Sequence, residues 1–198
     1  MTKQKTNSII YDDVFFDGNF TIEDFCIIGI PTSGRKSKKT LIGKNSLIRS
    51  GTYIYSGNVI GDNFNTGNKV NIRESNKIGN NVSIGTNTCI EHNVMIGNNV
   101  RIHSNAFIPE FSQLKDGCWI GPNVVLTNAK YPNEPDTKEN LAGPIIGKGS
   151  VIGANVTILP GVSVGNNTLI GAGSVVTKDT NDNEILIGNP AKKISNRE

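Results

Sequence analysis

The stretch that decides the fold is residues 78–108, which reads IGNNVSIGTNTCIEHNVMIGNNVRIHSNAFI. Isoleucine returns at every sixth position in it, and outward from there the spacing holds over Ile42–Leu126, with Thr66 as the one non-aliphatic member. The series resumes over Ile146–Val176 after an interruption. A unit of six residues is too short for a helix and its packing partner. Each unit is therefore predicted to be one short strand followed by a bend.

The residue at every sixth position is the anchor of its unit. The bends have their own signature, because the third residue after each anchor is Asn, Gly or Asp in 17 of the 20 complete units from Ile42 onward. These residue types tolerate positive φ, so each unit is predicted to end in a tight turn. Three units close a triangular coil of 18 residues, and stacked coils pair strand on strand about 4.7–4.9 Å apart. The sequence predicts an all-β fold, a parallel β-helix, in a single domain over residues 1–198. A sandwich would show turn signals every 8–12 residues instead.

Two segments are out of phase with the repeat and are predicted to leave the coil as loops, at about residues 31–40 and 128–144. The first contains the basic run Arg35–Lys39, which is either a solvated loop or a contact for a phosphate-bearing ligand. The second contains three prolines, which exclude a ladder strand. Long loops on rigid scaffolds tend to carry function. A short C-terminal tail is expected from about residue 188.

Composition excludes several classes of protein. The net charge of +3 is too small and too dispersed to argue for a nucleic-acid partner. No apolar run is long enough to span a membrane, and the N-terminus lacks a signal-peptide core. Cys26, Cys89 and Cys118 make no disulfide framework, which favours a cytoplasmic location. With two histidines at different corners, no metal site is expected.

Residues 18 apart lie above one another in such a coil, and one column differs from the rest. Glu74, His92, Glu110 and Asn128 are predicted to stack at about 4.8 Å intervals, ending where the second loop begins. His92 is the candidate general base, and the others, with Glu91 beside it in sequence, are candidate substrate-binding residues. The alternative is a solvated ladder without a chemical role.

Two further sets of residues are candidates for ligand contacts. His103 lies at a different corner, in a column of glycines, where it either contacts substrate or caps an edge. Near the C-terminus, Ala154, Ala172 and Pro190 are 18 apart and are predicted to form a strip of small side chains. Lys178 and Lys192 lie nearby in sequence, either as phosphate contacts or as ordinary solvated lysines.

The C-terminal part, which closes in Gly188-Asn189-Pro190-Ala191-Lys192, resembles the final coils of coenzyme A-dependent hexapeptide-repeat acyltransferases. The resemblance covers about residues 41–190 and implies a left-handed coil and a homotrimer. It also implies acetyl-CoA as co-substrate, its pantetheine arm lying along the strip of small residues in a groove between two subunits. Relatives that use an acyl carrier protein append a helical C-terminal domain, which favours coenzyme A as the donor here.

Residues 119–132 resemble a segment of N-acetyltransferases that act on nucleotide-linked amino sugars. Those enzymes carry Thr-Asn-Asp where this chain has Thr127-Asn128-Ala129, and phenylalanine at the position of Leu126. Glu110 matches a glutamate of their pattern, whereas some relatives carry asparagine at the position of His92. The resemblance implies acetyl transfer to the amino group of a nucleotide-linked amino sugar. The alternatives are an O-acetyltransferase acting on a sugar or antibiotic hydroxyl, and a non-catalytic scaffold.

Overall fold

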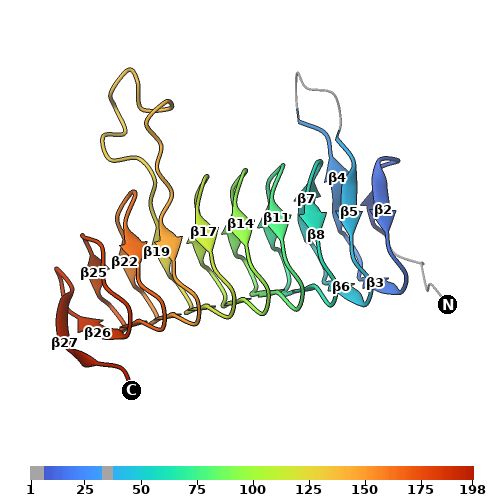
Figure 1. The fold of residues 1–198 in the computed structure, drawn as a ribbon. Coiled ribbons are helices and arrows are strands. Elements are labelled where there is room, and N and C mark those ends of the chain that lie inside the picture. Colours follow the sequence, from blue (N-terminus) through green and yellow to red (C-terminus); the bar gives the residue numbers. More distant parts are fainter. Residues whose placement is uncertain (1–6, 33–37) are drawn as a thin grey trace.

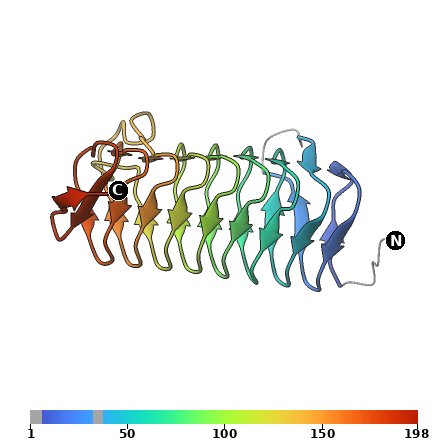
Figure 2. The same ribbon diagram turned by 60° about the horizontal axis from the view of Figure 1, so that its bottom comes forward.

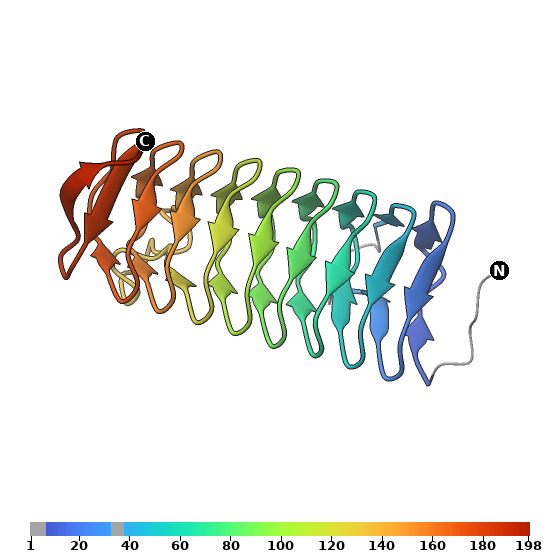
Figure 3. The ribbon, with the colours of Figure 1, turned by 90° about the horizontal axis from the view of Figure 1, so that it is seen from below.

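The computed structural model describes residues 7–32 and 38–198, and stacks them as the coils of a parallel β-helix (Figure 1). Every regular element in the described residues is a strand. Each full coil gives one strand to each of three sheets, which form the faces of a long prism (Figures 2 and 3). Within the part that the structure describes, no helix could cross a membrane.

The strands are short, and most have only two residues. Sheet A contains β1 (Ile9–Ile10), β4 (Ile27–Ile30), β7 (Tyr53–Tyr55), β10 (Asn71–Ile72), β13 (Cys89–Ile90), β16 (Phe107–Ile108), β19 (Val125–Leu126), β22 (Thr157–Ile158) and β25 (Val175–Val176). Sheet B contains β2 (Val14–Phe16), β5 (Thr40–Ile42), β8 (Val59–Ile60), β11 (Lys77–Ile78), β14 (Met95–Ile96), β17 (Gln113–Leu114), β20 (Ile145–Ile146) and β23 (Ser163–Val164). Sheet C contains β3 (Phe20–Ile22), β6 (Ser46–Ile48), β9 (Asn65–Thr66), β12 (Ser83–Ile84), β15 (Arg101–Ile102), β18 (Trp119–Ile120), β21 (Val151–Ile152), β24 (Leu169–Ile170), β26 (Glu184–Ile187) and β27 (Lys192–Asn196).

The strand register confirms the coil of 18 residues. Ile72 pairs with Ile90, and Ile90 pairs with Ile108, so the anchors stack in columns. Their side chains are buried and form the core, where close packing gathers many weak dispersion contacts. Thr66 is equally buried, and its hydroxyl accepts a hydrogen bond from the Arg49 backbone N–H at 2.9 Å. Thr66, the one polar residue of the series, therefore has a hydrogen-bond partner for its hydroxyl inside the prism.

The predicted bends also form. The asparagines at the third position, such as Asn81 and Asn99, have φ near +57°. The three residues that break the sequence rule adopt the same conformation, with φ of 56° at Lys69, 63° at Ser75 and 66° at Phe111. The fold therefore imposes a left-handed bend even where the side chain disfavours it.

Both out-of-phase segments lie between strands. Residues 127–144 contain no strand and project from the coil in Figure 1, and the Ala142 N–H donates to the Asn128 carbonyl at 2.9 Å across their base. In the first segment, Thr40 already belongs to β5. The basic run expected there lies partly outside the described residues, since Arg35 falls in residues 33–37.

The C-terminal end departs from the predicted spacing in two ways. Leu169 of β24 pairs with Ile185 of β26, an offset of 16, because residues 177–183 take a shorter path without a strand. The residue that follows Ala172 in its column is therefore Gly188, and the prediction that Pro190 lies in this column is wrong. The segment after residue 188, expected to be a short tail, contains β27, which turns back and pairs antiparallel with β26.

Candidate active site

The predicted polar column lies along one edge of the prism, between sheets A and B. Glu74, His92, Glu110 and Asn128 each stand two residues beyond a strand of sheet A, namely β10, β13, β16 and β19. The parallel register of these strands brings the four side chains to the same edge on successive coils. The stacking predicted from the spacing is therefore present.

Glu110 joins two members of this column. The Asn128 side-chain amide donates to Glu110 Oε2 at 2.6 Å, while Glu110 Oε1 lies 3.7 Å from His92 Nδ1. That second distance suits an ion pair and exceeds a hydrogen bond. His92 Nδ1 is buried and has no hydrogen-bond partner within the described residues. A small rotation of the imidazole would let its Nδ1–H donate to Glu110, which would fix the ring orientation.

Arg73 contacts the carboxylates on the other side of His92. Its Nε donates to Glu74 Oε2 at 3.0 Å, and its Nη1 lies 3.5 Å from Glu91 Oε2. Its guanidinium also lies 5.0 Å from the centre of the Tyr55 ring. Burial favours a higher pKa for Glu74, but a backbone hydrogen bond and the charge of Arg73 outweigh it and lower that pKa. Glu74 is only 8% exposed and forms an ion pair with Arg73, which leaves its carboxylate little access to a ligand.

Two buried asparagines fix the backbone under this edge. The Asn58 and Asn76 side-chain amides both donate to the Arg73 carbonyl, at 2.9 and 2.8 Å. Asn76 Oδ1 in turn accepts from the Val94 N–H at 2.7 Å, one coil further along. Buried amides that are fully paired in this way make a corner rigid. The edge that carries Arg73 and Glu74 is thus held from inside the prism.

Phe111 contacts the column from outside. Its ring meets the His92 imidazole edge-on, with 6.1 Å between the ring centres, and its side chain is 43% exposed. An exposed phenylalanine in a left-handed bend combines an unfavourable backbone with an unfavourable solvent contact. Such a residue is typical of a surface that another molecule covers.

The cysteines give no nucleophile at this edge. Cys89 Sγ donates to Glu91 Oε1 at 3.6 Å. Burial, and then the negative charge of Glu91, raise the Cys89 pKa to about 11, so its thiol stays protonated at neutral pH. Cys26 and Cys118 are free thiols buried in the core.

Glu91, His92 and Glu110 are also arranged so that a divalent ion could touch all three. One ligand atom from each lies within 4.8 Å of the others. Arg73 and Asn128 already engage the two carboxylates, however. The expectation that no metal binds remains a prediction.

His103 belongs to a different edge, the one that follows sheet C. It comes directly after β15, and its ring lies against that of Trp119, with 4.5 Å between the centres. Burial, followed by the charge of Arg101, lowers the His103 pKa. The two histidines therefore do not share a site within one chain.

Two of the candidate donor residues, Ala154 and Ala172, lie on this same edge, further toward the C-terminus, whereas Lys178 follows β25 of sheet A. Ala154 and Ala172 each stand two residues beyond a strand of sheet C, and Gly188 continues their column. Lys178 and Lys192 are exposed. The polar column and the strip of small residues are thus on separate edges of the prism.

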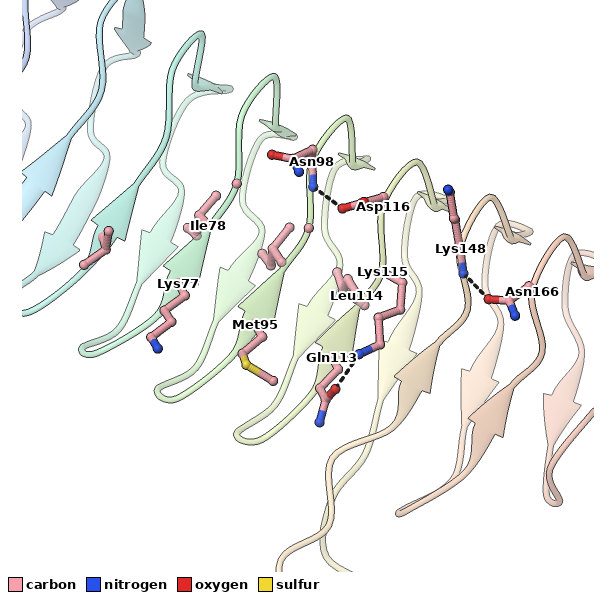
Figure 4. A pocket seen from close by; sticks show the side chains of 14 residues that line it. Lys77, Ile78, Met95, Asn98, Gln113, Leu114, Lys115, Asp116, Lys148 and Asn166 are labelled. Carbon is pink, nitrogen blue, oxygen red and sulfur yellow. Dashed lines mark hydrogen bonds between the residues drawn. The ribbon is translucent and has the colours of Figure 1, made fainter.

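A hollow of about 620 Å³ on the outer face of sheet B was not predicted (Figure 4). Met95, Val59 and Lys77 contribute to its lining, and Met95 follows His92 by three residues, so the hollow borders the polar column. The signal in the sequence was the exposed apolar side chain before several sheet B anchors, as at Val59 and Met95.

Comparison with known proteins finds parts of this chain similar to one family of repeat proteins. Residues 77–110 and 143–178 match the model of the family described as bacterial transferase hexapeptide (six repeats). Galactoside O-acetyltransferase of Lactococcus lactis subsp. lactis (strain IL1403) is 43% identical over 75 residues, which are 36% of this chain and 36% of that protein. The maltose O-acetyltransferase structure from Clostridium difficile 630 is 29% identical, with a TM-score of 0.55, over 61% of this chain and 68% of that one.

A second structure, of the polySia-specific acetyltransferase NeuO, matches 98% of this chain and 82% of its own with a TM-score of 0.58. At 24% identity it shows the fold alone. About a third of the chain thus matches the repeats of that family, and its fold is the left-handed parallel β-helix. The chain spans little more than a third of the length of the Lactococcus relative.

Proposed function

We propose that this protein transfers an acetyl group from acetyl-CoA to a sugar, with His92 as the general base. The arrangement of Asn128, Glu110 and His92 carries the proposal. A carboxylate beside one ring nitrogen of a histidine, itself held by an amide, is the arrangement that orients an imidazole for proton transfer. The acetyltransferase activities for which similar proteins are named support the choice of reaction.

In the proposed reaction, the acceptor oxygen or nitrogen attacks the thioester carbonyl of acetyl-CoA while His92 Nε2 takes the acceptor proton. Glu110 stabilises the imidazolium that forms, through Nδ1. The tetrahedral intermediate then collapses, the carbon–sulfur bond breaks, and His92 returns the proton to the departing thiolate. A positioned base contributes typically ~10²–10⁴-fold to the rate.

The other polar residues receive supporting roles in this proposal. Glu91 and Arg73 form a charged wall on one side of His92 that meets the acceptor's hydroxyl groups, and the buried Glu74 holds Arg73 in place. Asn128 holds Glu110 and joins the edge to the loop that begins there. Ala154 and Ala172 carry the pantetheine arm, with Lys178 and Lys192 near the nucleotide phosphates. His103, which lies on a different edge, is assigned to a separate ligand contact.

A sugar hydroxyl is the acceptor that we favour. Two similar proteins, the galactoside and maltose O-acetyltransferases, are named for the acetylation of oxygen. A hydroxyl also needs a positioned base more than an amine does, and the His92–Glu110 pair offers one. The second candidate is the amino group of a nucleotide-linked amino sugar, which the hydrogen-bonded Glu110 and Asn128 and the segment around them favour.

One experiment tests the base and the acceptor together. Coenzyme A release is measured from acetyl-CoA with simple sugars and, side by side, with nucleotide-linked amino sugars. We expect His92→Ala to slow turnover at least tenfold while calorimetry shows coenzyme A binding unchanged. Glu110→Gln should slow it less and move its pH profile, because the amide cannot stabilise an imidazolium. An unchanged rate in His92→Ala would place the base elsewhere, and no affinity for coenzyme A would favour a non-catalytic scaffold.

A further inference from the structure

A second hollow of about 290 Å³ lies on the edge that follows sheet C, away from the His92 column. The outward residues of successive sheet C strands form its floor, with Ser83 aligned on Arg101 in the register of β12 and β15. Gly67 and Gly85 leave the corner without side chains. The hollow is therefore an open trough that runs along the coils.

The two ends of the trough are cationic. Arg49 lies at one end, and Arg101 and His103 lie at the other, three coils further along, or roughly 14 Å at the usual strand spacing. No aspartate or glutamate lines the hollow, and in the described residues neither arginine forms an ion pair. Arginine of this kind, exposed and without a carboxylate partner, is well suited to bidentate contact with a phosphate.

A third observation concerns His103. Its Nε2 is buried and has no hydrogen-bond partner within the described residues. Buried polar atoms are rarely left unpaired, and each exception calls for an explanation such as an absent ligand or water. The Trp119 ring lies against the imidazole and holds it at the end of the trough.

We propose that this trough is a binding site for a phosphate or diphosphate group of a small molecule, held by Arg49 and Arg101 with His103 at one end. The hydroxyl of Ser83, on the floor between them, is a further donor to the phosphate oxygens. The size of the hollow suits the charged part of a ligand and leaves the remainder to extend along the edge. The proposal does not depend on acetyl transfer, since it uses no residue of the His92 column.

Trp119 makes the site directly observable, because it is the single tryptophan of the chain. The full-length protein is titrated with inorganic pyrophosphate while the Trp119 emission is followed, and calorimetry repeats the titration without an optical probe. We expect saturable binding. Arg101→Gln and Arg49→Gln should each weaken it at least tenfold, because each removes one bidentate donor.

Lys44→Gln is the matched control, since it removes the same charge from a different edge, where Lys44 pairs with Asp62 at 3.5 Å. It should leave the pyrophosphate affinity within twofold of the original protein. Far-ultraviolet circular dichroism checks that each variant keeps its fold. No saturable binding, or equal weakening by all three substitutions, would overturn the proposal.

Competition experiments distinguish which kind of ligand supplies the phosphate. Displacement of pyrophosphate by coenzyme A would assign the trough to the acyl donor, and displacement by a nucleoside diphosphate alone would assign it to an acceptor. Either result upholds the site. Equal displacement by sulfate at the same concentration would reduce it to a general anion patch and overturn the proposal.

Discussion

Phe111 occupies a backbone position where most coils have asparagine or glycine. Its φ of 66° costs a residue with a large side chain about 1 kcal/mol or more, and its ring meets His92. Lys69 has the same backbone, with a φ of 56°, but lies at a corner after sheet C, away from the polar column. Lys69 shows that the fold tolerates a strained bend far from the candidate site, whereas the strained bend at Phe111 lies beside it.

We expect Phe111→Asn to raise the thermal unfolding midpoint and to lower turnover. Asparagine tolerates the left-handed bend, while the contact with His92 is lost. Lys69→Asn should raise the midpoint by a similar amount, corresponding to up to about 1 kcal/mol, without a change in turnover. Thermal melts and initial rates of both variants are the measurements. Full activity in Phe111→Asn would mean that the ring has no part in the reaction.

The Cys89 thiol leads to a prediction about pH. Its pKa is raised from 9.0 to about 11, so at pH 8 the thiolate fraction is ~0.1% in place of ~10%, and alkylation should be roughly a hundredfold slower than for an ordinary thiol. The rate should recover only as the pH approaches 11. Iodoacetamide labelling followed by peptide mass spectrometry measures it, with the unfolded chain as the reference. Rapid labelling of the folded protein at pH 8 would contradict the raised pKa.

Much of the site's location could be predicted from the sequence, because a fixed register turns a spacing of 18 into a shared edge. The role of Arg73 was missed, although the same arithmetic places Tyr55, Arg73 and Glu91 in the adjacent column. The bond between Asn128 and Glu110 could not be predicted at all. It depends on side-chain rotamers, which spacing does not determine.

At the scale of the repeat element, side-chain oxygens tie successive coils together along the edge between sheets B and C. Asn80 Oδ1 accepts from the Asp62 N–H at 2.8 Å, and Asn98 Oδ1 accepts from the Asn80 N–H at 2.8 Å. Asp116 Oδ1 accepts from the Asn98 N–H at 2.7 Å (Figure 4). Each acceptor satisfies a corner N–H that the strands leave free. The ladder resumes after residues 127–144, where Asn166 Oδ1 accepts from the Lys148 N–H.

Removing one step of this ladder should cost a single hydrogen bond. We expect Asn80→Ala to lower the free energy of unfolding by about 1 kcal/mol, since the Asp62 N–H loses its acceptor at an exposed corner. Asn80→Asp keeps the acceptor oxygen and should lose less. Chemical denaturation of both variants measures the difference. Equal losses would show that the amide nitrogen matters more than the oxygen.

The repeat predicted the strands from β5 to β25, and their 18-residue register within each uninterrupted stretch, and failed where its own spacing ends. Residues 177–183 hold no apolar anchor in phase, so nothing in the pattern could indicate that β26 would pair at an offset of 16. β27 lies outside the repeat altogether and pairs antiparallel. A periodic sequence predicts its own continuation, and its closing elements depend on contacts that the period does not encode.

For the whole molecule, the separation of the two candidate surfaces decides how many copies a working site needs. The His92 column lies between sheets A and B, whereas Ala154 and Ala172 lie after sheet C. One rigid prism cannot bring two of its own edges together. If both surfaces serve one reaction, a second copy must supply one of them, which agrees with the expected trimer of 21.3-kDa chains.

Mixing two inactive variants tests this directly. His92→Ala removes the base, and Ala172→Trp blocks the strip, so each assembly alone should have little activity. When equal amounts are unfolded together and refolded, random assortment should leave roughly a quarter of the sites with both surfaces intact, and that fraction of activity should return. Sedimentation equilibrium on the same samples measures the number of copies. No recovery in a mixed assembly of confirmed trimers would mean that one chain supplies the whole site, and that the strip after sheet C does not hold the donor.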